Sequence, residues 1–210
     1  MGSDHYFSAQ PSTPLKRKTV TVRLGGADRT VVTSGGIFSP DGVDKGTAVL
    51  LAGAPAPAGH GALLDIGCGW GPIALSLALQ SPGATVYAVD VNERSIELTR
   101  ENAGLLGLGN VVAGTPDSVP ADLEFATIWS NPPIRVGKEE LHAILLQWLP
   151  RLAPGGVAWL VVQKNLGSDS LQAWLRDQLP AEWAVERAST SKSFRLLRVA
   201  RPPVATSTDQ

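Results

Sequence analysis

Cysteine, clustered histidine and long apolar runs are all scarce in this sequence, and each absence excludes a class of protein. The single cysteine, Cys68, cannot form an internal disulfide and fits a reducing compartment. The three histidines are scattered, so we expect no metal site. No run approaches the roughly 20 apolar residues of a membrane-spanning helix, and the first residues lack the pattern of a secretory signal. We therefore expect a cytoplasmic protein with no membrane partner.

Size and charge set further limits. The 210 residues, 43% of them hydrophobic, suffice for one well-buried domain but not for two. The formal net charge of −1 excludes a strong attraction of the whole molecule to nucleic acid. Basic residues nevertheless gather near both ends of the chain, namely Lys16, Arg17, Lys18, Arg23 and Arg29, and then Lys192, Arg195, Arg198 and Arg201. Two interpretations stay open: solvated strand faces, or a rim that faces RNA.

Composition and pattern divide the chain into four segments, which are a flexible N-terminal arm (1–17), a hairpin and helix extension packed on the main domain (18–60), the main domain (61–201) and a disordered tail (202–210). The arm carries prolines and little periodicity. In the extension, alternating patterns at 19–23 and 29–33 flank Gly25 and Gly26 and predict a hairpin. A short helix is predicted to follow at 44–51.

From residue 62 onward, apolar runs alternate with stretches of helical periodicity. They predict strands at 62–66, 85–89, 111–112, 125–129, 157–162, 183–188 and 194–199, and helices at 72–80, 93–106, 139–152 and 168–178, the last capped by Ser168. Strands joined by crossover helices form a mainly parallel sheet that is covered on both faces. The last two strands have no helix between them, so one should run antiparallel. The predicted fold class is α/β, a doubly wound, mainly parallel seven-stranded sheet with an N-terminal hairpin and helix extension.

The strand predicted at 62–66 runs directly into closely spaced glycines and a helix, in the order Asp65-Ile66-Gly67-Cys68-Gly69-Trp70-Gly71-Pro72. Such glycines let a ligand approach the backbone at the crevice beyond the strand ends. Gly71 follows Gly69 by two residues, where a dinucleotide-binding loop needs three. The Asp65 carboxylate would repel a pyrophosphate and attract an ammonium group. S-adenosylmethionine carries an ammonium and no phosphate, so we predict that it binds at Asp65, Gly67, Cys68, Gly69 and Gly71.

Asp90 and Val91 follow the next predicted strand and extend this site. A carboxylate at the end of that strand can accept hydrogen bonds from both ribose hydroxyls of a nucleoside. The alternative is that Asp90 only caps the helix that begins near Glu93. Cys68 is expected to fill the loop and not to act as a nucleophile, because no histidine lies near it in the sequence.

A second motif, Asn131-Pro132-Pro133-Ile134, follows the strand predicted at 125–129 and so opens at the same edge of the sheet, although a simple turn would use the same residues. An exocyclic amine is a poor nucleophile because its lone pair is delocalised into the ring. The Asn131 side-chain oxygen and the Pro132 carbonyl can each accept one of its hydrogens, and neither proline has an N–H that would compete. Fixed oxygen dipoles favour the charge that develops on nitrogen. We predict N-methylation with these four residues as catalytic, Asn131 also contacting the cofactor.

Together the two motifs resemble those of class I S-adenosylmethionine-dependent methyltransferases, and in particular the small-domain RNA methyltransferases akin to 16S rRNA guanine-N2 enzymes. The resemblance covers nearly the whole chain, including His5-Tyr6-Phe7-Ser8, Gly36-Ile37-Phe38-Ser39, Asp44-Lys45-Gly46-Thr47, Asp90-Val91-Asn92-Glu93, residues 131–138 and Gln163-Lys164. It implies that 61–201 is a methyltransferase domain and that Gly46 and Thr47 line the methionine end of the cofactor. It also implies guanine N2 of ribosomal RNA as the acceptor, and ribosomal RNA or the small ribosomal subunit as the partner.

Two positions depart from the family pattern. Ile134 stands where many amino-methylating relatives have an aromatic ring that stacks on the flipped base, so Phe38 or Phe194 should supply the stacking. Near the adenine the chain offers Thr115, with Asp117 displaced, where the family has an acid. Both differences fall inside the predicted site.

Three cations lie near the predicted active edge: Arg135, Lys138 and Lys164. They are predicted to hold RNA phosphates, although ordinary surface charge explains them equally well. Other functions also stay open. An amide of a protein glutamine or an adenine N6 amine presents the same NH₂ geometry, and a non-catalytic, cofactor-binding RNA or assembly factor would share the fold. The sequence does not indicate an oligomeric state.

Overall fold

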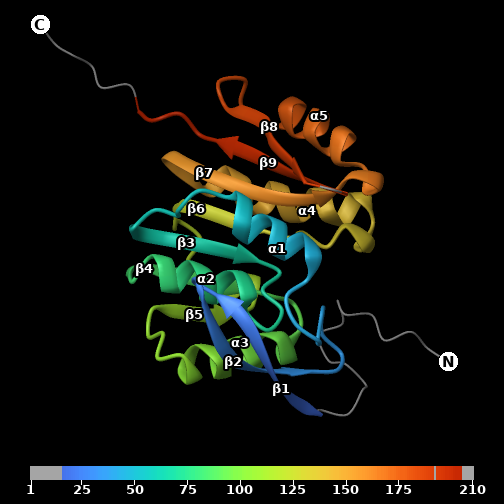
Figure 1. The fold of residues 1–210 in the computed structure, drawn as a ribbon. Helices are drawn as coiled ribbons and strands as arrows, with labels where there is room; N and C mark the ends of the chain where they lie inside the picture. The colour runs from blue at the N-terminus through green and yellow to red at the C-terminus, as the bar shows by residue number, and fades with distance from the viewer. Residues whose placement is uncertain (1–15, 192, 205–210) are drawn as a thin grey trace, which may run out of the picture.

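The computed structural model describes residues 16–191 and 193–204 (Figure 1). Residues 1–15 of the predicted arm, which include the motif at 5–8, lie outside the described residues, as do Lys192 and residues 205–210 of the predicted tail. Arg17, which the predicted arm included, is the first residue of a strand. None of the helices in the described part of the chain is long and apolar enough to cross a membrane.

The main sheet contains seven strands within the described residues: β3 (His60–Ile66), β4 (Gly83–Val89), β5 (Val111–Gly114), β6 (Phe125–Ser130), β7 (Leu152–Gln163), β8 (Ala184–Ser191) and β9 (Phe194–Ala200). Their order across the sheet is β5-β4-β3-β6-β7-β9-β8. β9 pairs antiparallel with β7 and β8, whereas the strands from β5 to β7 pair in parallel. The predicted fold class, with one antiparallel strand in the closing pair, is confirmed.

Helices cover both faces of this sheet because its strands bury side chains on both sides (Figure 1). They are α1 (Lys45–Gly53), α2 (Pro72–Gln80), α3 (Glu93–Leu105), α4 (Lys138–Trp148) and α5 (Ser168–Gln178). In β3, Leu64 packs in the apolar cluster of α4 and α5, while its neighbour Leu63 packs in the cluster of α1 and α2. Burying each leucine contributes roughly 1.5–3 kcal/mol of transfer free energy. The sheet is therefore packed between two apolar clusters.

An antiparallel hairpin, β1 (Arg17–Leu24) and β2 (Ala27–Ser34), precedes the main sheet. Gly25 and Gly26 form its turn with φ of +57° and +81°, the left-handed conformation that a two-residue hairpin turn needs. Leu24 and Val31 share an apolar cluster with Trp70, which lies in the glycine loop after β3. The hairpin therefore packs against the glycine loop through this apolar cluster. The division of the chain at residue 60 stays a prediction.

At three helix ends the boundary or the cap differs from the sequence prediction for a local reason. The helix predicted to reach residue 152 ends at Trp148, because Pro150 has no N–H to continue it, and a 3-10 turn leads into β7. Ser168 does not cap α5: the N-cap is Gly167, and the Ser168 hydroxyl is buried without a hydrogen-bond partner among the described residues. Asp44, predicted as the first helical residue, is the N-cap of α1.

Candidate active site

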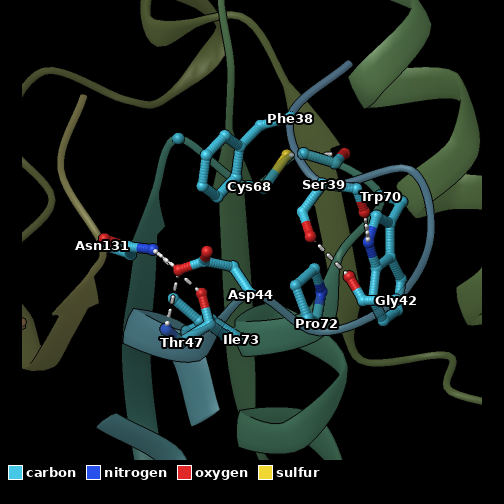
Figure 2. A pocket seen from close by; sticks show the side chains of 12 residues that line it. Phe38, Ser39, Gly42, Asp44, Thr47, Cys68, Trp70, Pro72, Ile73 and Asn131 are labelled. Atoms are coloured by element: carbon cyan, nitrogen blue, oxygen red, sulfur yellow. Dashed lines mark hydrogen bonds between the residues drawn. The ribbon is translucent and has the colours of Figure 1, made fainter. Parts of the chain in front are cut away.

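The loops that follow β3 and β6 meet at one edge of the sheet. Ile66 and Ser130 end these two adjacent strands in register, and the Ser130 hydroxyl donates to the Ile66 carbonyl at 2.8 Å. A pocket at this edge is lined by both loops and by the segment before α1 (Figure 2), namely Phe38, Ser39, Gly42, Asp44, Thr47, Gly67, Cys68, Gly69, Trp70, Pro72, Ile73 and Asn131. The two sequence motifs therefore face a common crevice.

Left-handed glycines shape the loop after β3. The φ angles are +78° at Gly67, +57° at Gly69 and +99° at Gly71, values that residues with a side chain rarely adopt. A Cβ on Gly71 would lie 3.1 Å from the Thr99 hydroxyl, so α3 packs directly against this glycine. The Thr99 hydroxyl also donates to the Gly69 carbonyl at 3.0 Å. The predicted role of the glycines in a sharp turn is thus matched by their geometry.

Asp65 lies beneath this loop with a fully buried side chain. Its Oδ2 accepts a hydrogen bond from the Ala74 N–H at 3.0 Å, while Oδ1 has no hydrogen-bond partner among the described residues. Burial raises the pKa of this carboxyl well above its usual range, the Ala74 N–H opposes the shift, and the nearby Asp90 adds to it. A buried carboxylate with an unpaired oxygen fits a cationic ligand and does not fit an anionic one.

Asp90 ties the glycine loop to the end of β4. Its carboxylate accepts hydrogen bonds from the backbone N–H groups of Gly69 and Asn92, each at 2.9 Å. Burial raises the pKa of Asp90, and these backbone hydrogen bonds oppose the shift. Asn92, not Asp90, is the N-cap of α3, so the alternative interpretation of Asp90 as the helix cap is wrong. Beside it, Val91 is 48% exposed at the same edge.

Cys68, in the glycine loop, is buried against α3. The Thr99 hydroxyl, which donates to the Gly69 carbonyl, also lies 3.5 Å from Cys68 Sγ. Burial raises the pKa of the Cys68 thiol well above its usual range, and the carboxyls of Asp90 and Asp65 raise it further. A thiol in this state is a poor nucleophile, in agreement with the expectation that Cys68 fills the loop.

Asn131, which directly follows β6, forms two side-chain hydrogen bonds through its amide nitrogen. Its Nδ2 donates to Asp44 Oδ2 at 3.0 Å and to Thr47 Oγ1 at 3.1 Å, as the dashed lines in Figure 2 show. Because the carboxamide group is planar, its oxygen lies on the side away from these two acceptors. The oxygen is therefore left to accept a hydrogen bond from a ligand.

The prolines after Asn131 differ in part from the prediction. The Pro132 carbonyl already accepts a hydrogen bond from the Ile134 N–H at 2.8 Å, so the backbone here does carry a competing donor. A carbonyl has a second lone pair, and Pro132 keeps room for one more hydrogen bond. The Ile134 side chain packs against the apolar cluster of α4 and α5, which makes it a structural residue of the loop.

Of the two phenylalanines predicted to stack on a base, Phe38 and Phe194, the first lines the pocket with Asn131. Phe38 lines the pocket and is 46% exposed (Figure 2). Phe194, at the start of β9, is half-buried, and its ring would lie 3.0 Å from a Cβ on Gly46. Of the two, Phe38 has the ring surface that a ligand can reach.

Of the cations predicted near the edge, Lys138 and Lys164 are exposed. Lys138 begins α4 and Lys164 follows β7, where its N–H donates to the Ser193 carbonyl at 2.6 Å. Arg135 belongs to a 3-10 turn after the Asn131 motif, and its side chain lies outside the described residues. Thr115, predicted near the adenine, is exposed directly after β5.

The basic residues at the two ends of the chain are mostly paired. The hairpin residues Arg17, Lys18 and Arg23 form ion pairs with Glu101, Asp41 and Asp28 at 3.1, 2.7 and 3.8 Å. Near the C-terminus, Arg195, Arg198 and Arg201 pair with Asp169, Glu186 and Glu124. This pairing favours the solvated-surface interpretation for these residues except Arg195, whose side chain is buried. In the described part of the chain, Lys138 and Lys164 form no ion pair, so they are the better candidates for phosphate contacts.

Sequence reasoning missed Asp44 as a site residue. The pattern Asp44-Lys45-Gly46-Thr47 before an apolar helix does signal an N-cap, and Asp44 accepts from the Gly46 N–H at 2.7 Å. Its contact with Asn131, however, joins residues 87 positions apart, and only the fold brings them together.

Known proteins are similar to this chain in sequence and in fold. The family model of the methyltransferase small domain matches residues 28–197. The uncharacterised Bacillus subtilis protein YbxB is 40% identical over 171 residues, which cover 80% of this chain and 85% of that protein. The ribosomal RNA small subunit methyltransferase C of Aeromonas hydrophila is 36% identical over 121 residues, which cover 58% of this chain and 35% of that enzyme.

Among solved structures, the T. thermophilus 16S rRNA N2 G1207 methyltransferase, in complex with AdoMet and guanosine, superposes with a TM-score of 0.73 at 24% identity. The match covers 91% of this chain and 52% of that one. The precorrin-6y C5,15-methyltransferase of Geobacter metallireducens gives a TM-score of 0.57 at 18% identity, over 74% of this chain and 86% of that one. The matched part thus spans about half or less of these ribosomal RNA methyltransferases. The family model matches most of the chain, and the glycine loop and the buried Asp65 agree with it. The chain therefore belongs to the methyltransferase small-domain family and is an S-adenosylmethionine-dependent methyltransferase.

Proposed function

We propose that this methyltransferase transfers a methyl group to the N2 amine of a guanine in the 16S RNA of the small ribosomal subunit. The observation that carries the proposal is the orientation of Asn131: its amide nitrogen faces Asp44 and Thr47, which leaves the oxygen as an acceptor beside the glycine loop. The ribosomal RNA methyltransferases among its relatives support RNA as the substrate class.

The residues of the chain would bind the cofactor as follows. When bound, S-adenosylmethionine supplies a methyl group activated on its sulfonium. The unpaired Oδ1 of Asp65 suits the ammonium of the methionine moiety. The Asp90 carboxylate suits the ribose hydroxyls, while Val91 and Thr115 border the adenine side. Thr47, the third helical residue of α1, lies at the methionine end.

Asn131 and Pro132 would prepare the acceptor nitrogen. Their oxygens accept the two amine hydrogens, which turns the nitrogen lone pair out of conjugation and toward the cofactor side of the crevice. As the nitrogen gains positive charge, these fixed dipoles stabilise it without reorganisation. No general base is needed, because an alkylated ammonium loses its proton readily to water.

The rim would hold the RNA around the target base. Phe38 offers an exposed ring for stacking a base that has been turned out of its helix, the part that Ile134 does not play. Lys138 and Lys164 stand on the same edge and suit phosphate oxygens, which position the RNA without reading its sequence.

One experiment tests the proposal. The protein is incubated with labelled S-adenosylmethionine and, separately, with small ribosomal subunits, naked 16S RNA, tRNA and release factors, and the modified nucleoside or residue is identified by mass spectrometry. We expect N2-methylguanosine in ribosomal RNA. Label on a glutamine of a release factor or on adenine N6 would assign one of the other amine acceptors. Cofactor binding without any transfer would assign a non-catalytic role.

A further inference from the structure

Asp44 makes three hydrogen bonds through a single oxygen. Its Oδ2 accepts from the backbone N–H groups of Gly46 at 2.7 Å and Thr47 at 3.4 Å, and these two bonds cap α1. The third donor is Asn131 Nδ2 at 3.0 Å. The N-cap residue of α1 is thus hydrogen-bonded directly to the residue that follows β6.

The chemistry of a carboxylate fixes which way the Asn131 amide faces. An ionised carboxylate only accepts hydrogen bonds, so it must meet the NH₂ end of the carboxamide. If the amide of Asn131 turned over, its oxygen would face the Asp44 carboxylate, and this contact would become repulsive. Thr47 Oγ1 accepts from the same nitrogen at 3.1 Å, but a hydroxyl can also donate, so the preference comes from Asp44.

The packing around this contact leaves little room for another arrangement. A Cβ on Gly46 would lie 3.0 Å from Asp44 Oδ2 and 3.3 Å from Asn131 Nδ2. The first turn of α1 therefore needs a glycine at this position so that the Asn131 amide can reach Asp44.

We propose that Asp44 is a positioning residue, which fixes the amide of Asn131 so that its oxygen always faces the acceptor. The inference rests on the proposed N-methyl transfer. A site with a locked hydrogen-bond acceptor at this place favours acceptors that carry N–H hydrogens. It disfavours a ring nitrogen or a carbonyl oxygen, which would meet the Asn131 oxygen with a lone pair. Asp44 thus contributes to the choice of an amine over the other nucleophilic atoms of a base.

A matched pair of variants separates this role from helix capping. Serine and asparagine are both good N-caps and both remove the charge, so Asp44→Ser and Asp44→Asn should preserve α1 equally. Only asparagine is long enough to place an acceptor oxygen where Asp44 Oδ2 meets Asn131. We expect Asp44→Ser to lower kcat about 100-fold, as a misaligned reactive group does. Asp44→Asn should recover at least about tenfold of that loss, and both variants should keep the wild-type affinity for S-adenosylmethionine.

A second measurement is independent of the acceptor. The side-chain NH₂ signals of Asn131 in a ¹H–¹⁵N spectrum, assigned with Asn131→Asp, report its hydrogen bonds. In the wild type and in Asp44→Asn these protons should exchange slowly with water. In Asp44→Ser the signals should shift and lose their protection.

The outcomes are distinct. Unchanged Asn131 signals in Asp44→Ser would overturn the inference whatever the acceptor is, as would equal kcat values for Asp44→Ser and the wild type on 16S RNA or small subunits. If the wild type methylates neither RNA nor subunits, the proposed function fails, and the amide signals still decide the role of Asp44.

Discussion

The side chain of Asn102 pairs with the backbone of Val32 as a neighbouring β-strand would. Its Oδ1 accepts from the Val32 N–H at 2.7 Å and its Nδ2 donates to the Val32 carbonyl at 2.9 Å. The same Nδ2 donates to the Trp70 carbonyl in the glycine loop at 2.9 Å. One fully buried residue of α3 therefore ties the N-terminal hairpin to the cofactor loop.

Replacing Asn102 should destabilise the protein and loosen the cofactor loop together. Asn102→Leu keeps the branching of the side chain at Cγ but leaves a buried N–H and two carbonyls unpaired, which costs about 3 kcal/mol. Thermal unfolding should then begin roughly 6–12 °C lower, and S-adenosylmethionine should bind more weakly in calorimetry. Arg17→Gln is the control, because the exposed Arg17–Glu101 ion pair also joins the hairpin to α3 and contributes less than about 1 kcal/mol. Equal melting of both variants would contradict this account.

Asn131→Ala should separate catalysis from cofactor binding. The variant loses the oxygen that accepts the amine hydrogen, so kcat should fall at least about 100-fold. Its effect on the affinity for S-adenosylmethionine should be small, since the glycine loop and Asp65 are unchanged. Single-turnover methyl transfer and calorimetry measure the two quantities. Full activity in the variant would refute the role of Asn131.

Gly46→Ala should lower activity. Alanine favours the helix by up to about 1 kcal/mol, but its Cβ would press on Asp44, Phe194 and Asn131. We expect a kcat loss of about tenfold or more, since a displacement well below 1 Å already disturbs alignment. Gly104→Ala in α3 is the matched control, because a Cβ there meets nothing within 4 Å. Similar activity in the two variants would show that the contact at Gly46 is unimportant.

The pH dependence of stability should reveal Asp65. Because burial raises its pKa in the folded state above the ordinary 3.8, the folded state takes up a proton more readily than the unfolded state. Its contribution to the free energy of unfolding is therefore greatest below that value and is lost as the pH rises through the raised pKa. At neutral pH, Asp65→Asn should melt at a higher temperature than the wild type, yet bind S-adenosylmethionine more weakly. A lower melting temperature for Asp65→Asn at neutral pH would show that its carboxylate is stabilised by partners not accounted for.

Neutralising a rim cation should weaken RNA binding without affecting the cofactor. If Lys164 contacts a phosphate, Lys164→Gln should reduce the slope of the logarithmic salt dependence of RNA affinity by about one. Lys18→Gln is the control, because Lys18 is exposed on the hairpin and paired with Asp41. Filter binding of 16S RNA at several salt concentrations measures both. The same slope for Lys164→Gln and the wild type would remove Lys164 from the RNA interface.

The sequence sufficed for the sheet, the glycine loop and the Asn131 motif because these signals are local. Buried strands, left-handed glycines and helix starts depend on neighbouring residues, and the carboxyl ends of parallel strands meet at one edge by topology. The end of α4 and the cap of α5 were missed, because local details at Pro150 and Gly167 compete with helical periodicity, whereas the bounds predicted for α5 are those of the structure.

What the sequence could not show are the contacts between distant segments. Asn102 in a helix gives no sign that it pairs with Val32, and Asp44 gives no sign that it holds Asn131. The hydrogen bond between the Ile134 N–H and the Pro132 carbonyl also escaped, because it depends on the local bend of the chain after the prolines. Each of these contacts sets the orientation of a group in the site, whereas the periodic pattern of the sequence predicts only where the site lies in the fold.

The reversed direction of β9 has a consequence for how such an enzyme could acquire a new acceptor. Because β9 starts at Phe194, opposite Gln163, the start of β9 lies at the edge at which the parallel strands end. Across the sheet, β6 and β7 separate it from β3, which leads into the glycine loop. Insertions before β9 would change the side of the site at which the nucleophile enters and leave the glycine loop unchanged.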